Sequence, residues 1–492
     1  MTQELLPILN RVVERGYQLT PEAFTHLQAI PLEQVTAVVE RALQVAEGRP
    51  ELFVIDQEFL LSLSKAPEPT QVAREARPSL AARIESRLEV MPVDEPSPEG
   101  DVNGFIDLFN SRFAQLEIIL KRRVDVRDAI PLSQAVKLPV KSKFKTIGLV
   151  SGKRAKSNRL FLELESPETS ITVMVSGAEA VEKGMEILDD QVICIDGLKY
   201  RDDLLIANDL IWPDVPIRDS SRADEPVCAV IIGDVHVGSK YFREDLFERF
   251  IRWMNMDLGP QASRELASRV KYVVIVGDLV DGIGIYPDQL DELTLTTQDA
   301  QYEEAARLLA QLPEYVEMVI IPGNHDAVRR SLPQPPIPES YAPSLYKDTR
   351  VHLLPNPSTI SLHGVKMLLA HGKALDDILS STPGYDFHNP VKGVELLLRC
   401  NHVAPIYGQS TPLAPEKIDR LVIREIPDVF VMGHIHIFEH RKYKNVTLVS
   451  TGSFQDQTPF QRRMKIDPTP GVVSVFNLMN YQNIPLDLER LD

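Results

Sequence analysis

Five short apolar segments, each followed at once by polar residues, are the sequence feature that most constrains the fold of this chain. They are residues 229–232, 272–276, 318–321, 367–370 and 429–432. Short apolar runs bounded by glycine and polar residues are typical of strands that are buried on both faces of a sheet. In an open α/β sheet, the loops after the carboxyl ends of the strands lie along one edge. We therefore expect the five polar loops to meet at one site.

The five loops carry carboxylate, amide and imidazole side chains, a mixture that suits divalent transition metals. The candidate metal ligands are Asp234, His236, Asp278, Asn324, His371, His434 and His436. Asp278 has two carboxylate oxygens and can bridge two cations, so seven ligands around two metal ions leave positions for water and a phosphate oxygen. Two metal ions about 3.5–4 Å apart lower the pKa of a bridging water towards about 7 and clamp phosphate oxygens. This ligand set predicts metal-assisted phosphoester hydrolysis.

Each loop alone is weak evidence, because Asp-x-His is common by chance and a lone buried histidine is more often a hydrogen-bonded core residue. The occurrence of all five loops in order, each at a strand end, favours a dinuclear site. His325 follows Asn324 and is expected to face outward, where it can stabilise the transition state or protonate the leaving oxygen. We expect Asp281 to orient His325, with a turn-capping role as the alternative.

Charge and composition limit the function classes. A net charge of -17 over 492 residues argues against a surface that serves as a whole as a nucleic-acid platform. Cys194, Cys228 and Cys400 have no metal-type or redox spacing, which argues against a disulfide framework. The start of the chain has no basic leader and no apolar stretch reaches about 18 residues, so we expect a cytoplasmic protein without membrane association.

The chain is long enough for about three domains at about 150 residues each. Helical periodicity predicts an N-terminal helical domain over residues 1–64, and recurrent prolines predict a flexible linker over 65–103. An amphipathic helix followed by a small β-barrel is expected over 104–216, and Phe105, Phe109, Phe113, Leu116 and Leu120 form the apolar face of this helix. Alternating strands and helices over 217–492 predict a layered α/β domain.

The barrel prediction depends on five segments with a period of two. They are residues 146–150, 160–164, 171–175, 191–198 and 204–211. With a helical insert near residues 178–184 they fit an OB-like barrel, although other small barrels fit nearly as well. This region is also the most basic part of the chain and includes Lys153 and Arg154, so nucleic-acid contact and a solvated edge are both open interpretations.

Two arginine pairs lie close to the predicted site. Arg329 and Arg330 follow the third polar loop. Arg462 and Arg463 follow the strand that comes after the fifth polar loop. They can contact DNA phosphates, or they can be ordinary exposed basic pairs.

Longer sequence blocks around the five loops resemble a known family. These blocks are residues 233–238, 276–282, 322–326, 404–408, 411–417, 433–436, 451–455 and 466–471. They resemble the calcineurin-like metallophosphoesterase superfamily and, within its double-strand-break-repair nuclease branch, the small-subunit family of archaeal D-family DNA polymerases. The resemblance covers residues from about 104 to the C-terminus, and the first hundred residues resemble that family only in layout.

This resemblance implies a β-sandwich metallophosphoesterase domain with helices on both faces, preceded by the OB-like barrel. It implies one metal ion held by Asp234, His236, Asp278 and His436, a second held by Asp278, Asn324, His371 and His434, and a catalytic His325. Mn is favoured for both ions, with Fe, Zn, Co or Ni as alternatives. The implied activity is 3′–5′ exonuclease proofreading at DNA 3′ ends in complex with a large polymerase subunit. A non-catalytic scaffold with a vestigial metal site and a stand-alone phosphoesterase remain alternatives.

Overall fold

The computed structural model describes residues 79–92, 100–156 and 159–491 without gaps. In the N-terminal part it describes residues 17–29 and 54–57, together with positions 12, 15, 35, 39, 42, 43 and 60. The chain forms two compact units, residues 1–77 and 78–492. Among the described residues, no helix is both long and apolar enough to cross a membrane.

The described part of the first unit is a small core around one helix. Helix α2 (Pro21–Ala29) begins after Thr20, whose hydroxyl accepts a hydrogen bond from the Ala23 N–H (3.2 Å). Two short strands, β1 (Gln18–Leu19) and β2 (Val54–Ile55), pair in parallel. Apolar residues that precede and follow α2 in the sequence complete the core. Most of the helical domain predicted over 1–64 lies outside the described residues.

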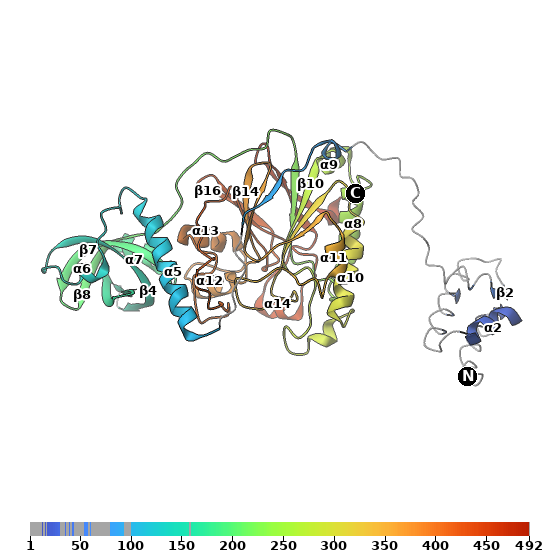
Figure 1. Cartoon of the computed structure of the whole chain (residues 1–492), viewed down its shortest axis with the longest axis horizontal. Helices are drawn as coiled ribbons and strands as arrows, with labels where there is room; N and C mark the ends of the chain where they lie inside the picture. The colour runs from blue at the N-terminus through green and yellow to red at the C-terminus, as the bar shows by residue number, and fades with distance from the viewer. Residues whose placement is uncertain are drawn as a thin grey trace. The chain divides into compact units, whose positions relative to one another are not determined.

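A closed barrel of five strands follows helix α5 (Val102–Lys121), as Figure 1 shows. Its strands are β4 (Lys143–Lys156), β5 (Arg159–Ser166), β6 (Thr169–Val175), β7 (Val192–Arg201) and β8 (Leu204–Ile211). The order around the barrel is β4-β5-β6-β8-β7, and α7 (Ala178–Met185) connects β6 to β7. The predicted five-stranded barrel with its helical insert is confirmed. A short helix, α6 (Leu132–Ala135), precedes it.

Two six-stranded sheets form the centre of the second unit. The first has the order β12-β11-β10-β9-β18-β19, and the second β16-β17-β15-β14-β13-β3. The first sheet consists of β9 (Cys228–Ile232), β10 (Val270–Val276), β11 (Glu317–Ile321), β12 (Val351–Leu353), β18 (Val472–Asn477) and β19 (Asn483–Asp487). The second consists of β3 (Leu88–Val90), β13 (Ser358–Leu362), β14 (Val365–Ala370), β15 (Val429–Met432), β16 (Glu439–Tyr443) and β17 (Val446–Ser450).

The two sheets pack face to face. Tyr272, Val274 and Val276 of β10 share one buried cluster with residues of β13, β14 and β15. Their neighbours Val273 and Ile275 point to the opposite face and join a second cluster. Because successive side chains alternate between faces, a strand buried on both sides must be apolar throughout. This explains the continuous apolar runs in the sequence.

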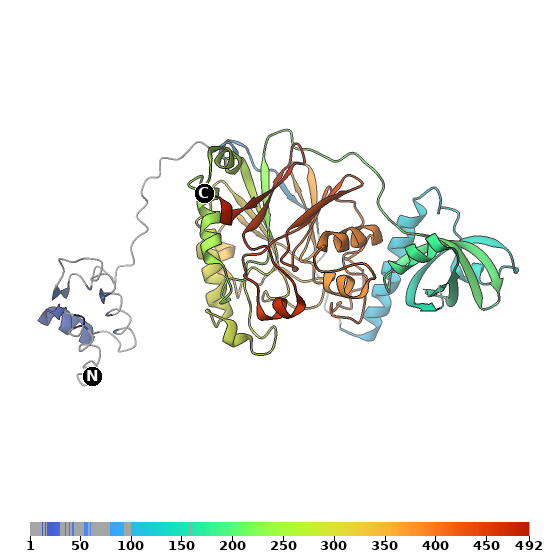
Figure 2. The same ribbon diagram turned by 180° about the vertical axis from the view of Figure 1, so that it is seen from behind.

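Helices cover the outer faces of both sheets, as the two opposite views show (Figures 1 and 2). On the first sheet lie α8 (Glu244–Met254), α9 (Gln261–Ala267), α10 (Gln298–Leu309) and α11 (Pro343–Lys347). On the second lie α12 (Leu375–Ser381) and α13 (Pro390–Cys400). Helix α14 (Pro459–Met464) and the 3₁₀ helices η2 (Gln289–Glu292) and η3 (Leu488–Arg490) complete this region. The mixed α/β class is thus confirmed.

Part of the predicted linker is an integral piece of the second sheet. Strand β3 pairs antiparallel with β13, and η1 (Ala81–Arg83) precedes it. The Ser79 hydroxyl donates to the Ser268 carbonyl (2.9 Å), and the Arg87 N–H donates to the Tyr272 hydroxyl (2.8 Å). The expectation of a flexible linker is therefore corrected for residues 79–90, because these bonds fix the segment to the α/β domain.

A buried ion cluster joins α5 to the α/β domain. Arg112 and Asp419 are fully buried, and Arg112 Nε donates to Asp419 Oδ2 (2.7 Å). His402 Nε2 lies 3.0 Å from the same oxygen. Burial raises the pKa of Asp419, but the charges of His402 and Arg112 outweigh burial and lower it. The carboxylate is thus ionised and depends on both partners.

We expect Arg112→Ala to lower the free energy of unfolding by about 3–5 kcal/mol, because it leaves a buried carboxylate without its cation. Urea denaturation at pH 7 measures this loss. The matched control is Lys121→Ala on the same helix, which removes a solvent-exposed pair with Glu117 and should cost at most about 1 kcal/mol. Equal losses in the two variants would contradict a stabilising role for the buried cluster.

Candidate metal centre

The five polar loops meet at one edge of the sandwich. Each follows a parallel strand: β9 and β10 lead to Asp234 and Asp278, β11 to Asn324, β14 to His371, and β15 to His434 and His436. Three groups within this set have ligand atoms that lie within 4.8 Å of one another. They are Asp234, His236 and His436; Asp278, His371 and His434; and His236, Asp278 and His325.

The first group presents imidazole nitrogens at the spacing that one metal ion requires. His236 Nε2 lies 3.2 Å from His436 Nε2, and His436 Nε2 lies 3.4 Å from Asp234 Oδ1. Two nitrogens bonded to one ion at about 2.0–2.1 Å are themselves about 3 Å apart. The residues of this group therefore fit a divalent cation.

The second group has similar spacings and includes Asp278. His371 Nε2 lies 3.0 Å from Asn324 Oδ1 and 3.3 Å from Asp278 Oδ2. The same Asp278 oxygen lies 3.8 Å from His236 Nε2. Asp278 thus stands between the two groups, as expected of a bridging carboxylate.

Contacts behind the histidine rings fix their orientation. His236 Nδ1 lies 3.0 Å from Asp281 Oδ1, and His371 Nδ1 lies 3.0 Å from the Val276 carbonyl oxygen. A hydrogen bond to one ring nitrogen holds the ring and leaves the other nitrogen free to bind metal. On His434 it is Nε2 that is held, 3.0 Å from Asp376 Oδ2.

The backbone at the site is strained. Five of the seven candidate ligands have a positive φ: Asp234 (53°), His236 (57°), Asp278 (49°), His434 (73°) and His436 (64°). Left-handed conformations are uncommon for residues other than glycine and concentrate at functional sites. Such a concentration in five ligand residues favours a functional role for these loops.

Two glycines allow the loops to approach one another. A Cβ at Gly323 would lie 2.1 Å from Asp278 Oδ1, and a Cβ at Gly277 (φ 92°) would lie 2.5 Å from His371 Nδ1. Neither contact leaves room for a side chain. The glycines in these two loops are therefore required by the close packing around Asp278.

The electrostatics of the cluster also suit a cation. Burial lowers the pKa of His371, but the negative charges of Asp278 and Asp234 outweigh it and raise this pKa to about 9. Burial raises the pKa of Asp278, yet the charges of His371 and His325 lower it well below its usual value. Ionised carboxylates therefore create a negative potential that favours bound cations.

His325 faces the cleft, but its contact with Asp281 differs from the prediction. His325 Nδ1 lies 2.7 Å from the Asp281 backbone carbonyl oxygen, not from the carboxylate. The carboxylate instead contacts His236 and accepts a hydrogen bond from Gln289 Nε2 (3.0 Å). The expected side-chain pairing is corrected: Asp281 orients His236 through its carboxylate and His325 through its carbonyl.

Several residues at the site were not among the candidates. Asp376 contacts His434, and Lys373 Nζ donates to Asp376 Oδ2 (2.6 Å). Gln461 Nε2 lies 2.9 Å from His436 Nδ1. In the sequence, the one signal for Lys373 and Asp376 is their position just after His371. No sequence pattern indicates that Gln461 belongs to the site.

An open cavity of about 690 Å³ lies over the cluster. Its walls include His325, Lys373, Asp376, Tyr286, Phe387, Phe460 and Arg463. Of the six basic residues predicted to contact DNA, Arg463 is the one that lines this cavity.

The other predicted DNA contacts are placed elsewhere. Arg329 pairs with Glu416 (2.8 Å), and Arg330 donates to the Gly284 carbonyl (2.9 Å). Lys153 donates to the Met185 and Ile187 carbonyls, and burial lowers its pKa. Arg154 lies over the Phe161 ring, and Arg462 is exposed on α14. Lys153 and Arg329 are thus held by the protein itself.

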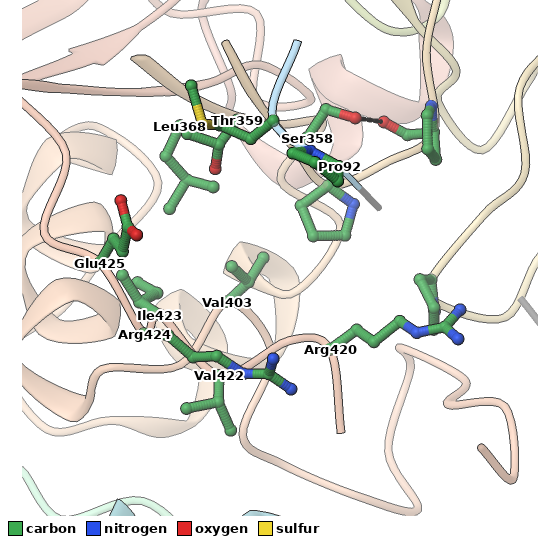
Figure 3. A pocket seen from close by; sticks show the side chains of 14 residues that line it. Pro92, Ser358, Thr359, Leu368, Val403, Arg420, Val422, Ile423, Arg424 and Glu425 are labelled. Atoms are coloured by element: carbon green, nitrogen blue, oxygen red, sulfur yellow. Dashed lines mark hydrogen bonds between the residues drawn. The ribbon is translucent and has the colours of Figure 1, made fainter. Parts of the chain in front are cut away.

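A second cavity, of about 310 Å³, lies apart from the cluster (Figure 3). Its walls include Leu368, Val403 and Val422, with Arg420, Arg424 and Glu425 nearby. None of the candidate ligands lines it, so it does not belong to the candidate metal centre.

Comparisons with known proteins identify the family. Residues 229–440 match the B-subunit family model of DNA polymerases alpha and epsilon. The DNA polymerase II small subunit of Methanothermobacter thermautotrophicus is 36% identical over 477 residues, covering 96% of this chain and 97% of that protein. The small subunit of Archaeoglobus fulgidus is 35% identical, covering 95% of each chain. These matches confirm the resemblance to archaeal polymerase small subunits, and the chain belongs to the family of DNA polymerase II small subunits.

Proposed function

We propose that this chain is the proofreading subunit of a replicative DNA polymerase. In this proposal it hydrolyses DNA phosphodiester bonds from 3′ ends, with two divalent metal ions, in complex with a large polymerase subunit. The observation that carries the proposal is the position of Asp278 between two groups of ligand residues beneath an open cavity. Family membership supplies the polymerase context.

The ligand sets follow from the two groups. Asp234, His236, Asp278 and His436 would hold one ion, and Asp278, Asn324, His371 and His434 the other, with Mn favoured and Fe, Zn, Co or Ni as alternatives. When bound, such ions act as Lewis acids towards phosphate and lower the pKa of a nucleophilic water. The chain itself fixes the orientation of three ligand imidazoles, since Asp281 holds His236, the Val276 carbonyl holds His371 and Asp376 holds His434.

His325 is the proposed catalytic histidine. Its Nδ1 is held by the Asp281 carbonyl, so that Nδ1 carries a proton and Nε2 is the nitrogen available to substrate. In the imidazolium form, Nε2 can donate a proton to the leaving 3′ oxygen of the primer strand. The ring packs edge-on against His236 at 4.8 Å, which places this proton beside the ligand cluster.

We expect His325→Ala to lower kcat for removal of a mismatched 3′ nucleotide by about 10²–10⁴-fold, the usual contribution of a general acid. The assay uses the Mn-loaded chain with its large subunit, and elemental analysis checks that both ions remain bound. The control is His388→Ala, an exposed histidine outside the loops. Full activity of His325→Ala would show that His325 is not the general acid. No hydrolysis by the unaltered complex with any of the five metals would favour a scaffold with a vestigial site.

Asp278→Asn should weaken the binding of both metal ions, because it removes the carboxylate charge that lies between the two ligand groups. In the unaltered chain, saturation at about 100 times the Kd should stabilise the fold by about 2.7 kcal/mol per ion. Calorimetric titration with Mn²⁺ and the accompanying rise in Tm measure the effect. The exposed Asp299→Asn on α10 should behave like the unaltered chain. Uptake of two ions with unchanged affinity by Asp278→Asn would rule out a bridging role.

A further inference from the structure

Exposed aromatic rings stand at the mouth of the candidate cleft. Phe460 is 60% exposed and Tyr286 37% exposed, and both line the cavity above the ligand cluster. We infer that Phe460 and Tyr286 stack against unpaired bases of a single-stranded DNA 3′ end, while Arg463 contacts its phosphates. This inference rests on the proposed function and adds the form of DNA that the cleft accepts.

Phe460 is exposed but lies on a helix whose start is fixed. It is the second residue of α14, whose start is fixed by a reciprocal pair of hydrogen bonds between Thr458 and Gln461. Gln461 also contacts His436 Nδ1, so α14 is tied directly to the ligand cluster. An exposed apolar ring on an anchored helix is suited to a planar apolar partner such as a base.

Tyr286 lines the same cavity, and its side chain is held by its hydroxyl group. Its hydroxyl donates to Glu292 Oε2 (2.8 Å), and Arg330 donates to the Gly284 carbonyl two residues before it. Its ring centroid lies 6.4 Å from that of His325. A base stacked on Tyr286 would therefore lie beside the proposed catalytic histidine.

The size of the cavity favours a single strand. Its volume of about 690 Å³ falls in the range of about 300–1,000 Å³ that encloses a small organic ligand. The candidate ligands Asp234, His236, Asp278 and His371 at its base are buried. The end of a single strand, one or two nucleotides long, matches a cavity of this volume and can reach these buried ligands.

The charges around the cavity favour stacking over general phosphate binding. Lys373 is paired with Asp376, and Asp288 and Glu292 also line the walls. Arg463 is exposed and lies three residues after Phe460, so the two side chains share one side of α14. An aromatic ring with a neighbouring arginine is a common arrangement for binding single-stranded nucleic acid.

The test compares Phe460→Ala with the matched control Met464→Ala, an exposed residue on the same helix that does not line the cavity. Both are assayed in the Mn-loaded complex on two oligonucleotides, one with normal bases and one whose last two 3′ positions are abasic. We expect Phe460→Ala to lower kcat/KM about tenfold on the normal oligonucleotide, the scale of one base–aromatic stack. On the abasic one it should have no effect, and Phe460→Trp should restore the rate.

A second readout needs no hydrolysis. With a chelator present, an oligonucleotide with 2-aminopurine at its 3′ end should lose fluorescence on binding the unaltered complex, and less so with Phe460→Ala. Equal loss of kcat/KM on both oligonucleotides, or unchanged quenching, would overturn the stacking role. The stacking role would also be overturned if Phe460→Ala impaired only the assembly of the chain with the large subunit, because Phe460 would then be a subunit contact. Absence of hydrolysis by the unaltered complex would instead contradict the proposed function.

Discussion

The buried carboxylate of Asp278 is the charge around which the rest of the site is arranged. It lies at the end of β10, and its Oδ1 accepts a hydrogen bond from the His325 N–H (2.8 Å), which ties it to the loop after β11. Burying an ionised carboxylate without partners is costly. The imidazoles of His236 and His371, close to its other oxygen, offset that cost. Gly277 and Gly323 let the neighbouring loops come close together, so that these loops surround the Asp278 carboxylate.

The two-sheet architecture makes such an arrangement possible. β9, β10 and β11 are parallel in one sheet, and β14, β15 and β17 are parallel in the other. Because the sheets face one another, the carboxyl ends of both sets supply loops to the same edge. Helices over the outer faces exclude water from the strands, so the loops project from a rigid base. Short surface elements such as α14 and the segment around Tyr286 add to the ligand loops in forming the walls of the cavity.

The sequence was most informative where a ligand directly follows a strand. All seven candidate ligands lie within four residues of an apolar run, so periodicity and residue type were sufficient to group them. Asp376 and Gln461 could not be found in this way, because their contacts depend on which loops meet in three dimensions. The role of Asp281 was misjudged for the same reason, since sequence proximity cannot tell whether a carboxylate or a carbonyl faces a ring.

Helix α5 shows a second limit of sequence patterns. Periodicity predicts one apolar face with Phe105, Phe109, Phe113, Leu116 and Leu120. Leu116 and Leu120 are buried, but the three phenylalanines are only half-buried, and the buried stripe runs through Leu108 and Arg112 instead. The burial of Arg112 can be predicted only if its partner is known. That partner, Asp419, lies 307 positions away in the sequence, so no local pattern connects the two. Strand β3, with three residues, is too short to show any period.

The spread of the ligands along the chain has a consequence for biosynthesis. The His434 N–H donates to Asp234 across 200 positions, so the two ends of the cluster are separated by most of the α/β domain. Contacts between such distant positions form only after the intervening chain has been ordered. A nascent or truncated chain that ends before β15 lacks His434 and His436 altogether. The candidate metal centre can therefore be completed only once nearly the whole domain has been synthesised, so the hydrolysis proposed for it would be confined to fully folded molecules.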